Sequence, residues 1–260
     1  MSLRPWESPS GPAFEAFLRA HHPLSLRLRG ALAESGGSIP LWVDDPAGPR
    51  LAVHAARGTL FPLGETALLL ARLDELDALS AQLGAEEDLL RLASLPLPQR
   101  DAVAAARRLI RQTACGFYTL RAEDFRPFEG GPPVESLREE DAPLLAQLGE
   151  YGESEEYCRE RIRGAPSAAV RIGGEPASYM VVHANGSIGM LRTLEAHRSR
   201  GLARSVVTAL VRRQLARGRE VYCYIVDGNA PSERVFLSLG FERAADAVWA
   251  TFERGRAAGG

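Results

Sequence analysis

The sequence has few cysteines, no lysine and no long apolar run. Its three cysteines, Cys115, Cys158 and Cys223, lie far apart and form no C-x-x-C pair, so we expect neither a zinc site nor a disulfide framework. No stretch approaches the roughly 20 apolar residues that a membrane helix needs. The opening MSLRPWESPSGP lacks the apolar core of a secretory signal. We therefore expect a soluble, cytoplasmic protein with no membrane partner and no bound metal.

Charge of either sign is not in excess. All 31 basic residues are arginine and face 33 acidic ones, for a formal net charge of -2 and a pI near 6.3. Proteins that bind duplex nucleic acid usually present a basic face, so we expect no nucleic-acid partner. The chain is 45% apolar and 25% charged, which is ordinary for a globular protein, and 260 residues suffice for two domains.

The first half, residues 1–128, reads as a small α/β domain. Apolar residues recur at helical spacing from Phe14, are interrupted at Pro23, and stop at a Gly-Gly pair. Short apolar runs separated by Pro, Gly and Asp then indicate strands, and a Leu/Ala-rich stretch indicates helix. We expect strands at 39–43, 50–56, 59–63 and 115–120, and helices within 14–34 and 66–110.

The segment DFRPFEGGPP, residues 124–133, has the Pro and Gly content of a linker, so we place the second domain at 133–260. Ser154 is a candidate helix N-cap, and Asn185-Gly186 predicts a hairpin turn. The pattern is that of an α+β sheet domain. We expect strands at 134–138, 167–172, 177–184, 187–194 and 220–226, helices at 139–152, 154–163, 201–217 and 231–239, and a closing hairpin over 241–254.

One strand–turn–helix unit in this half has a pattern suited to phosphate. The strand ends at Leu191-Arg192-Thr193, and a helix begins at Gly201. The first N–H groups of a helix have no intrahelical partner, and together with the helix dipole they bind anions. Gly201 allows close backbone approach because it has no Cβ. Cationic attraction would come from Arg198, Arg200 and Arg204.

Two segments of this half resemble the GNAT superfamily of N-acyltransferases. R-S-R-G-L-A, residues 198–203, is similar to the R/Q-x-x-G-x-G/A signature, and NAPSERVFLSLGF, residues 229–241, is similar to the N-x-x-A/S-x-x-x-Y-x-x-L-G-F ending. The resemblance covers about half the chain, from Val134 onward. It implies a GNAT fold, α+β, with a mixed, mostly antiparallel twisted sheet flanked by helices. The first half lacks such a signature and would be a smaller, degenerate GNAT-like α/β domain.

The resemblance also implies acetyl-CoA, or another acyl-CoA, as cofactor. The pantetheine arm would add to the edge of the strand at 191–193. Backbone N–H groups of 199–204 would hold the pyrophosphate, and one near Leu191 would stabilise the oxyanion. Asn229 would hold the arm or cap the next helix. The implied cofactor-binding residues are Leu191, Arg192, Thr193, Arg198, Ser199, Arg200, Gly201, Leu202, Ala203, Arg204, Asn229, Ser232 and Phe236.

The acid and base of a transfer reaction are less well defined. Phe236 stands where the family often has a tyrosine that protonates the leaving thiolate, and phenylalanine cannot donate a proton. A thiolate with a pKa near 8.5 leaves unprotonated at a cost of about 2 kcal/mol, which is tolerable. Other candidate donors are Ser232, Tyr222 and Tyr224. The strand at 187–194 has no carboxylate; candidate bases are Glu195, His183 and His197, with Glu150, Tyr151 and Glu153 near the acceptor.

These features favour an N-acetyltransferase that transfers acetyl from acetyl-CoA to a primary amine of a small molecule or peptide. Direct attack in a ternary complex fits best, because no G-x-S-x-G and no cysteine lies in the motif region. A non-catalytic acyl-CoA-binding regulatory protein is one alternative. An amino-acid N-acyltransferase using longer acyl-CoA is another, since G-x-L-R-T-L-x-x-x-R is similar to glycine N-acyltransferases. Monomer and homodimer both remain open.

Overall fold

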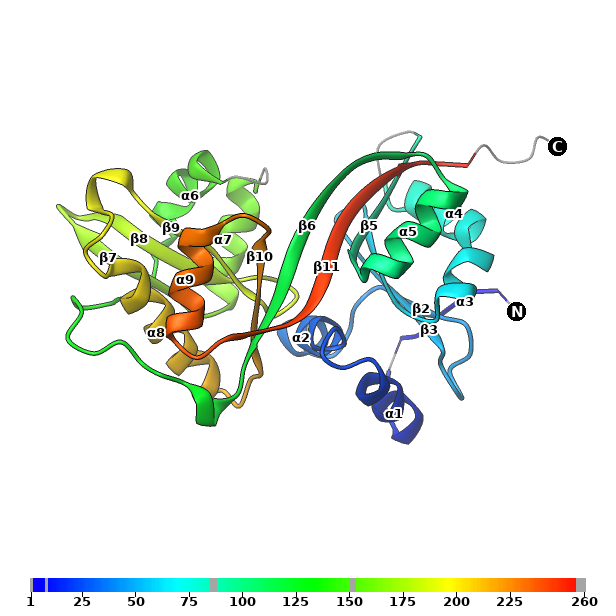
Figure 1. Cartoon of the computed structure of the whole chain (residues 1–260), viewed down its shortest axis with the longest axis horizontal. Helices are drawn as coiled ribbons and strands as arrows, with labels where there is room; N and C mark the ends of the chain where they lie inside the picture. Colours follow the sequence, from blue (N-terminus) through cyan, green and yellow to red (C-terminus); the bar gives the residue numbers. More distant parts are fainter. Residues whose placement is uncertain (1, 8, 85–87, 150–152, 256–260) are drawn as a thin grey trace. The chain divides into compact units, whose positions relative to one another are not determined.

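The computed structural model describes residues 2–7, 9–84, 88–149 and 153–255 (Figure 1). The chain forms two compact units, each built from separate stretches. One comprises Met1–Leu28, Ser35–Phe117 and Ala244–Gly260, and the other Arg29–Glu34 and Tyr118–Arg243. The boundary predicted at 128–133 falls inside the second unit, in a segment without helix or strand, and stays a prediction.

The first unit is a mostly antiparallel sheet with helices packed on it. Strands run in the order β1-β2-β3-β4-β5-β11-β6, and β4 with β5 is a parallel pair. Leucines of the strands and of α3 and α4 form its core with Val248 and Phe252 of β11. The elements are β1 (Arg4–Pro5), α1 (Pro12–Ala20), α2 (Leu26–Glu34), which continues into the second unit, β2 (Leu41–Val43), β3 (Leu51–Ala56), β4 (Thr59–Gly64), α3 (Thr66–Ala71), α4 (Leu73–Gln82), β5 (Leu89–Leu95), α5 (Leu97–Ala106), β6 (Leu109–Leu120) and β11 (Glu242–Glu253).

Two predictions for this unit are wrong. Residues 89–95, expected to be helical, form β5, because Leu90 and Leu92 fill the core while the strand pairs with β4 and β11. The closing hairpin over 241–254 is instead the single long strand β11, which pairs with β5 from Val248 to Glu253. The helix break at Pro23 and the strands near 39–63 are confirmed.

In the second unit, three antiparallel strands have helices on both faces (Figure 1). One face packs on α8, and the other on α6 and α7. The strand β10 is hydrogen-bonded to β6 and not to this three-stranded sheet. The elements are α6 (Ala142–Leu148), α7 (Glu155–Gly164), β7 (Ser167–Ile172), β8 (Glu175–Val182), β9 (Ile188–Thr193), α8 (Leu202–Ala216), β10 (Val221–Val226) and α9 (Ala230–Ser238), with 3-10 turns at Ala122–Asp124, Glu139–Asp141 and Glu195–His197.

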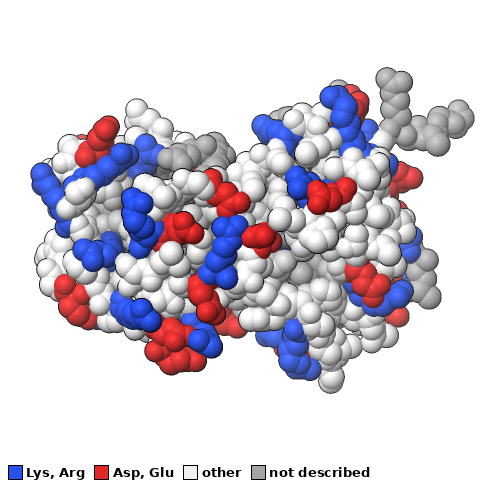
Figure 2. All heavy atoms as spheres, viewed as in Figure 1, with Lys and Arg blue, Asp and Glu red and all other residues white. Residues whose placement is uncertain are grey.

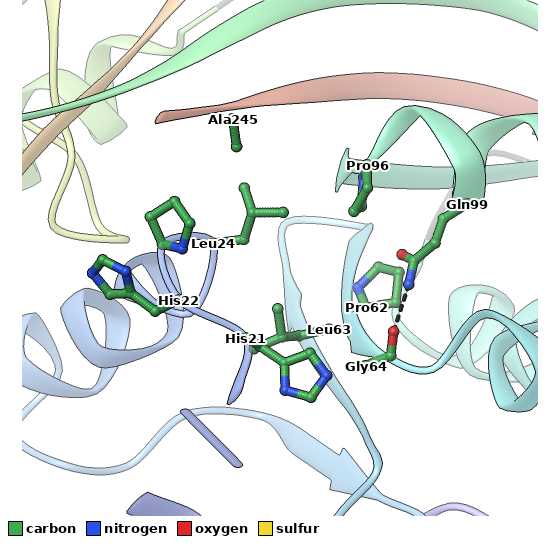
Figure 3. A pocket seen from close by; sticks show the side chains of 10 residues that line it. His21, His22, Leu24, Pro62, Leu63, Gly64, Pro96, Gln99 and Ala245 are labelled. Atoms are coloured by element: carbon green, nitrogen blue, oxygen red, sulfur yellow. Dashed lines mark hydrogen bonds between the residues drawn. The ribbon is translucent and has the colours of Figure 1, made fainter. Parts of the chain in front are cut away.

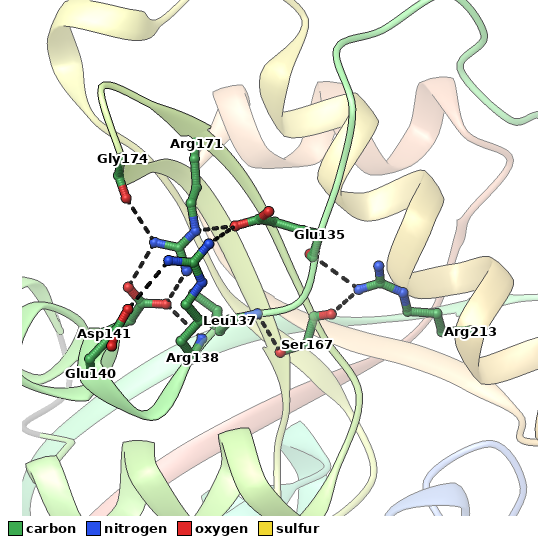
Figure 4. Close-up of polar contacts among 9 residues, drawn as sticks. All are labelled: Glu135, Leu137, Arg138, Glu140, Asp141, Ser167, Arg171, Gly174 and Arg213. Carbon is green, nitrogen blue, oxygen red and sulfur yellow. Dashed lines mark hydrogen bonds and ion pairs between the residues drawn. The ribbon is translucent and has the colours of Figure 1, made fainter.

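The segment 134–138, predicted as a strand, makes only an isolated bridge between Glu135 and Ala169. Polar contacts hold it in place (Figure 4). The Leu137 N–H donates to Ser167 Oγ at 3.0 Å, and the buried Asp141 carboxylate receives two hydrogen bonds from Arg171, at 2.9 and 2.5 Å. Burial alone would raise the pKa of Asp141, but the hydrogen bonds from Arg171 and the backbone N–H of 138 lower it overall.

The hairpin and cap predictions for this unit are confirmed. Ser154 Oγ accepts the N–H of Tyr157 at 3.2 Å, and Asn185-Gly186 forms the turn between β8 and β9. Among the described residues, no helix combines the length and hydropathy that crossing a bilayer requires. On the face seen in Figure 2, arginine and acidic side chains are interspersed, which is typical of a solvated surface.

Candidate active site

The strand β9 bends at a bulge immediately before the predicted cofactor residues. Tyr179 of β8 pairs with Arg192 and Val181 pairs with Gly189, so one residue of β8 opposes two of β9. Met190, one of these two, has a left-handed φ of 54°. Such a bulge bends the strand locally and re-aims a side chain. Leu191 accordingly packs toward α8, whereas Met190 packs toward α6 and α7.

Two edge strands lie side by side beyond this bulge. The strand β9 ends one sheet and β10 ends another, and the two are close in space without being neighbours in a hydrogen-bonded ladder over the described residues. Edge strands can accept an additional extended chain through backbone hydrogen bonds. On the inner side, the β9 residues Arg192 and Thr193 are fixed by Ser178, whose Oγ donates to the Arg192 carbonyl at 3.0 Å and lies 2.9 Å from Thr193 Oγ.

The turn between β9 and α8 contains two residues with left-handed backbone. Ser199 has φ 62° and Gly201, the N-cap of α8, has φ 77°. The N–H of Arg198 donates to the Glu195 carbonyl at 3.2 Å. From Ser199 to Arg204, the described part of the chain provides no hydrogen-bond acceptor for the backbone N–H groups. Consecutive unpaired N–H groups in such a turn form an anion-binding concavity at the helix end.

The helix α8 is fixed behind this turn by its buried face. Leu202 is 5% exposed, and Val206, Val207, Leu210 and Val211 are fully buried in the core. The segment before α6 also packs on α8. There, the Phe128 N–H donates to Thr208 Oγ at 3.1 Å, and the Arg204 guanidinium lies 4.0 Å from the centre of the Phe128 ring.

The charged side chains of the turn face solvent. Arg198, Arg200 and Arg204 are exposed, as is Ser199, whereas Ala203 is half-buried. The turn therefore combines unpaired amides, a left-handed glycine and three exposed arginines, which is a donor set that suits a diphosphate. The residues present thus fit the nucleotide part of a coenzyme.

The second motif, residues 229–241, forms the helix α9 and the residues that flank it. Asn229 Oδ1 accepts the N–H of Ser232 at 3.2 Å, so Asn229 caps α9, which was one of its two expected roles. Phe236 is 2% exposed and packs edge-on against Phe241, with ring centres 5.0 Å apart. A phenylalanine is therefore accommodated here as a core residue, in the same apolar cluster as Leu202 of α8.

The candidate acids and bases are dispersed. The Tyr222 hydroxyl donates to the Asn185 carbonyl and is buried, so it is engaged in holding the β8–β9 turn and is a poor proton donor for catalysis. Tyr224 of β10 and Ser232 of α9 are half-buried, and Glu195 is exposed. Glu150 and Tyr151 lie outside the described residues.

A pair that the sequence did not single out lies on the α7 side of the sheet. The Tyr157 hydroxyl is 2.8 Å from His183 Nδ1. His183 Nε2 abuts Gly189, where a Cβ would come within 2.3 Å of it. His183 had been considered as a base, but Tyr157 had not, because only the packing of α7 on β8 brings them together. The two aromatic residues thus adjoin the residue that precedes the bulge.

Comparisons with known proteins agree with the family resemblance of the sequence. Residues 173–250 match the family model of FR47-like proteins. No curated protein matches the sequence. Among solved structures, a Drosophila protein is 18% identical with a TM-score of 0.72, and the match covers 96% of this chain and 98% of that one.

Two further structures carry GNAT descriptions. A GCN5-related N-acetyltransferase from Kribbella flavida is 15% identical with a TM-score of 0.60, over 92% of this chain and 96% of that one. A tandem GNAT protein from the clavulanic acid biosynthesis pathway is 18% identical with a TM-score of 0.57, over 98% and 99%. The predicted fold class is confirmed by these matches. The chain thus carries an FR47-like segment at residues 173–250 and is similar in fold, over nearly its whole length, to proteins described as GNAT acetyltransferases.

Proposed function

We propose that this protein is an N-acetyltransferase that transfers acetyl from acetyl-CoA to a primary amine of a small molecule or peptide. The observation that carries the proposal is the run of unpaired backbone N–H groups from Ser199 to Arg204, at the end of a helix fixed in the core. When bound, acetyl-CoA supplies an activated thioester. A nucleotide diphosphate would accept hydrogen bonds from these amides, with the three arginines providing additional attraction.

The edge of β9 provides the support for the reacting end. Its residues 191–193 would hold the extended arm as an additional strand, on the side of β9 that faces β10. The bulge at Met190 changes the direction of the backbone there, so that an N–H near Leu191 could serve the developing oxyanion. Amine attack then needs no covalent intermediate on the protein.

The proposed reaction needs two proton transfers, one to the leaving thiolate and one from the attacking amine. With Phe236 in the core, we assign protonation of the thiolate to Tyr224, Ser232 or water, which a thiol pKa near 8.5 makes feasible at about 2 kcal/mol. An amine with a pKa near 10.4 needs about 4.6 kcal/mol to lose its proton at pH 7, so a base or a less basic amine is needed. Of the candidate bases from the sequence we keep Glu195 and His183, the latter because it adjoins the residue that precedes the bulge.

The cofactor site is tested by placing a negative charge at the helix end. Gly201 is unsuitable, because its backbone is left-handed and any side chain would alter the turn itself. Ala203→Asp adds an acid in the first turn of α8, where a carboxylate favours the helix dipole but repels phosphate. Two charges about 4 Å apart repel by about 4 kcal/mol near a surface, so we expect acetyl-CoA affinity to fall at least about tenfold in calorimetric titration.

Ala216→Asp is the matched control, since it makes the same change at the exposed far end of the same helix. We expect this variant to bind acetyl-CoA as the unaltered chain does. Equal affinity in the Ala203→Asp variant would place the cofactor elsewhere and remove the basis of the proposal.

The buried Phe236 and the absence of a carboxylate in β9 favour one rival, a non-catalytic acyl-CoA-binding regulator. Release of coenzyme A from acetyl-CoA with a panel of amines separates it from the enzyme. Binding without release would support the regulator. Release only with longer acyl-CoA and amino acids would support an amino-acid N-acyltransferase.

A further inference from the structure

The segment 128–131 lies against the first half of α8, within the same compact unit. The Phe128 N–H donates to Thr208 Oγ at 3.1 Å, and the Phe128 side chain packs on the apolar cluster that includes the buried face of α8. Further along the segment, Gly131 is so close to the helix that a Cβ would clash with Ser205 Oγ. These contacts fix the position of the Phe128 ring beside the helix.

The guanidinium of Arg204 lies over this ring. Its central carbon is 4.0 Å from the ring centre, a distance at which the ring face attracts a cation. Both groups are next to the turn, because a Cβ on Gly201 would lie 3.1 Å from two ring carbons and 3.9 Å from Arg204 Nη2. The Arg204 side chain is exposed, yet this contact holds its charge at the amino end of α8.

Arg204 differs from the other arginines of α8 in its partner. It makes no ion pair and no hydrogen bond through its guanidinium within the part of the chain that the structure describes. The others, including the one at the C-cap, each contact an oxygen: Arg212 with Glu129, Arg213 with the Ser167 carbonyl and Arg217 with Glu34. A neutral ring fixes a charge in place without neutralising it. The charge of Arg204 is therefore both held and available to an anion.

The half-open pocket of the first unit has no comparable group (Figure 3). The residues that line it include three prolines and two leucines but no arginine, and Gln99 Nε2 donates to the Gly64 carbonyl at 2.6 Å. Phosphate groups are bound most strongly by cations and by several N–H donors together. This pocket therefore does not suit a phosphate, whereas the turn beside Arg204 does.

We propose that Phe128 is a positioning residue, which fixes the Arg204 guanidinium for a phosphate group of the coenzyme. The inference rests on the proposed binding of acetyl-CoA and adds to it a residue that lies outside both sequence motifs. An arginine that is already held loses less conformational freedom when it binds. Having to order the same side chain at the moment of binding weakens affinity by about two- to tenfold.

A double-mutant cycle, measured by calorimetric titration with acetyl-CoA, tests this role. Phe128→Leu keeps an apolar side chain beside the turn but removes the aromatic face, so we expect affinity to fall about two- to tenfold. In a chain that already carries Arg204→Met, the same replacement should have no further effect. A role of Phe128 in packing alone would weaken binding equally with and without the arginine, and that result would overturn the assignment.

Phe125→Leu is the matched control. Phe125 packs on the same apolar cluster and contacts no arginine ring-to-cation within the described residues, so its replacement should leave acetyl-CoA affinity unchanged. Should the unaltered chain not bind acetyl-CoA, the proposed function and this inference both fall. Normal binding by the unaltered chain with no loss in Phe128→Leu removes this inference alone.

A second measurement needs neither the coenzyme nor a variant. Nitrogen-15 relaxation of arginine Nε reports side-chain motion on the picosecond to nanosecond timescale. In the unaltered chain, the order parameter of Arg204 should exceed that of Arg200, which is exposed in the same turn and has no ring contact among the described residues. In Phe128→Leu, the Arg204 value should fall to that of Arg200. Equal order parameters in the unaltered chain would show that the ring does not hold the arginine.

Discussion

At the scale of single residues, Gly201 determines the shape of the turn between β9 and α8. Its φ is 77°, and a Cβ would lie 3.1 Å from two carbons of the Phe128 ring. Gly218, just beyond the other end of α8, has φ 66° but no atom within 4 Å of a Cβ. Left-handed backbone costs an L-residue about 1–2 kcal/mol. We expect Gly218→Ala to lower the free energy of unfolding by that amount, and Gly201→Ala to lower it further.

Urea denaturation of the two variants measures both values. The excess at Gly201 reports the contact with Phe128, because the backbone conformation is similar at both positions. A loss at Gly201 equal to or smaller than that at Gly218 would mean that the Phe128 ring moves away freely.

A second residue, His54, makes stability depend on pH. Burial lowers its pKa from 6.5 to about 4; the hydrogen bond of Nδ1 to the Pro40 carbonyl opposes this, and the nearby Arg27 charge adds to it. Between these pH values the unfolded chain binds a proton that the folded chain does not, so stability falls as pH decreases from 6.5 to 4. At pH 5 the loss is about 1–2 kcal/mol.

Replacement His54→Gln removes this titration. We expect urea denaturation at pH 7 and pH 5 to show a smaller change in unfolding free energy for the variant than for the unaltered chain. An identical pH dependence in both would show that other groups cause the loss.

The turn at residues 198–204 could be predicted at this scale because a local motif specifies its backbone geometry, on which its proposed function depends. Gly201 and the helix that follows it were expected from sequence and occur as expected. By contrast, the bulge at Met190 and the Tyr157–His183 contact depend on how β9 and α7 pack on β8, and no local pattern encodes them. Phe236, which its motif position assigns to the cofactor, is buried in the core, and its contact with the cofactor stays a prediction.

At the scale of elements, the wrong secondary-structure predictions concern segments 89–95 and 242–253. In each, the local sequence favours one structure and the packing of the folded chain imposes another. The stretch LLRLASL has helical composition, but Leu90 and Leu92 alternate with less buried residues, as a half-buried strand requires. Residues 242–253 contain no Gly or Pro, so nothing interrupts β11 where a hairpin was expected. Whether these segments form strands is determined by the strands that pair with them, which are distant in sequence.

Polar contacts, and not strand pairing, hold the segment 134–138 that was predicted to be a strand. The ion pair of Asp141 with Arg171 is the anchor of this segment. Asp141 and Arg171 form a buried pair, in which the Arg171 side chain is 11% exposed and also contacts Glu135. Removing one partner of a buried pair costs about 3 kcal/mol, because the other charge remains. We expect Asp141→Asn to lower the free energy of unfolding by about this amount at pH 7. Glu140→Gln, in an exposed pair with Arg138, should change it by less than about 1 kcal/mol.

Acid provides a further check on this anchor. The pKa of Asp141 is below its ordinary value of 3.8 in the folded chain, so its contribution is full above pH 3.8 and is lost as pH falls through the lowered value. The difference between the unaltered chain and the Asn variant should therefore narrow below pH 4 in urea denaturation. A difference that is small at pH 7, or constant with pH, would show that the pair is not the anchor.

At the scale of the whole molecule, segments far apart in sequence complete each compact unit. The first unit takes β11 from the end of the chain, and Val248, Ala250 and Phe252 fill its core. The second unit takes residues 29–34, where Gly30 is so close to the Asn185 carbonyl that a Cβ would come within 2.2 Å of it. The linker-like composition at 124–133 gave no indication of this exchange.

Because each unit contains a segment from the other half of the sequence, we can predict how fragments of the chain behave. A fragment 1–128 lacks β11. In this fragment β5 has no antiparallel partner, and the core of the first unit lacks Phe252. A fragment 133–260 lacks Tyr118 and Leu120 of the second core and the strand that pairs with β10. We expect neither fragment alone to unfold cooperatively in circular dichroism melting, because each has lost part of its core. The full chain, cleaved after folding at an engineered protease site between the exposed Glu129 and Gly130, should remain one particle in size-exclusion chromatography and melt cooperatively. If either isolated fragment melts as sharply as the cleaved chain, the exchanged segments are dispensable and the units fold along the predicted boundary.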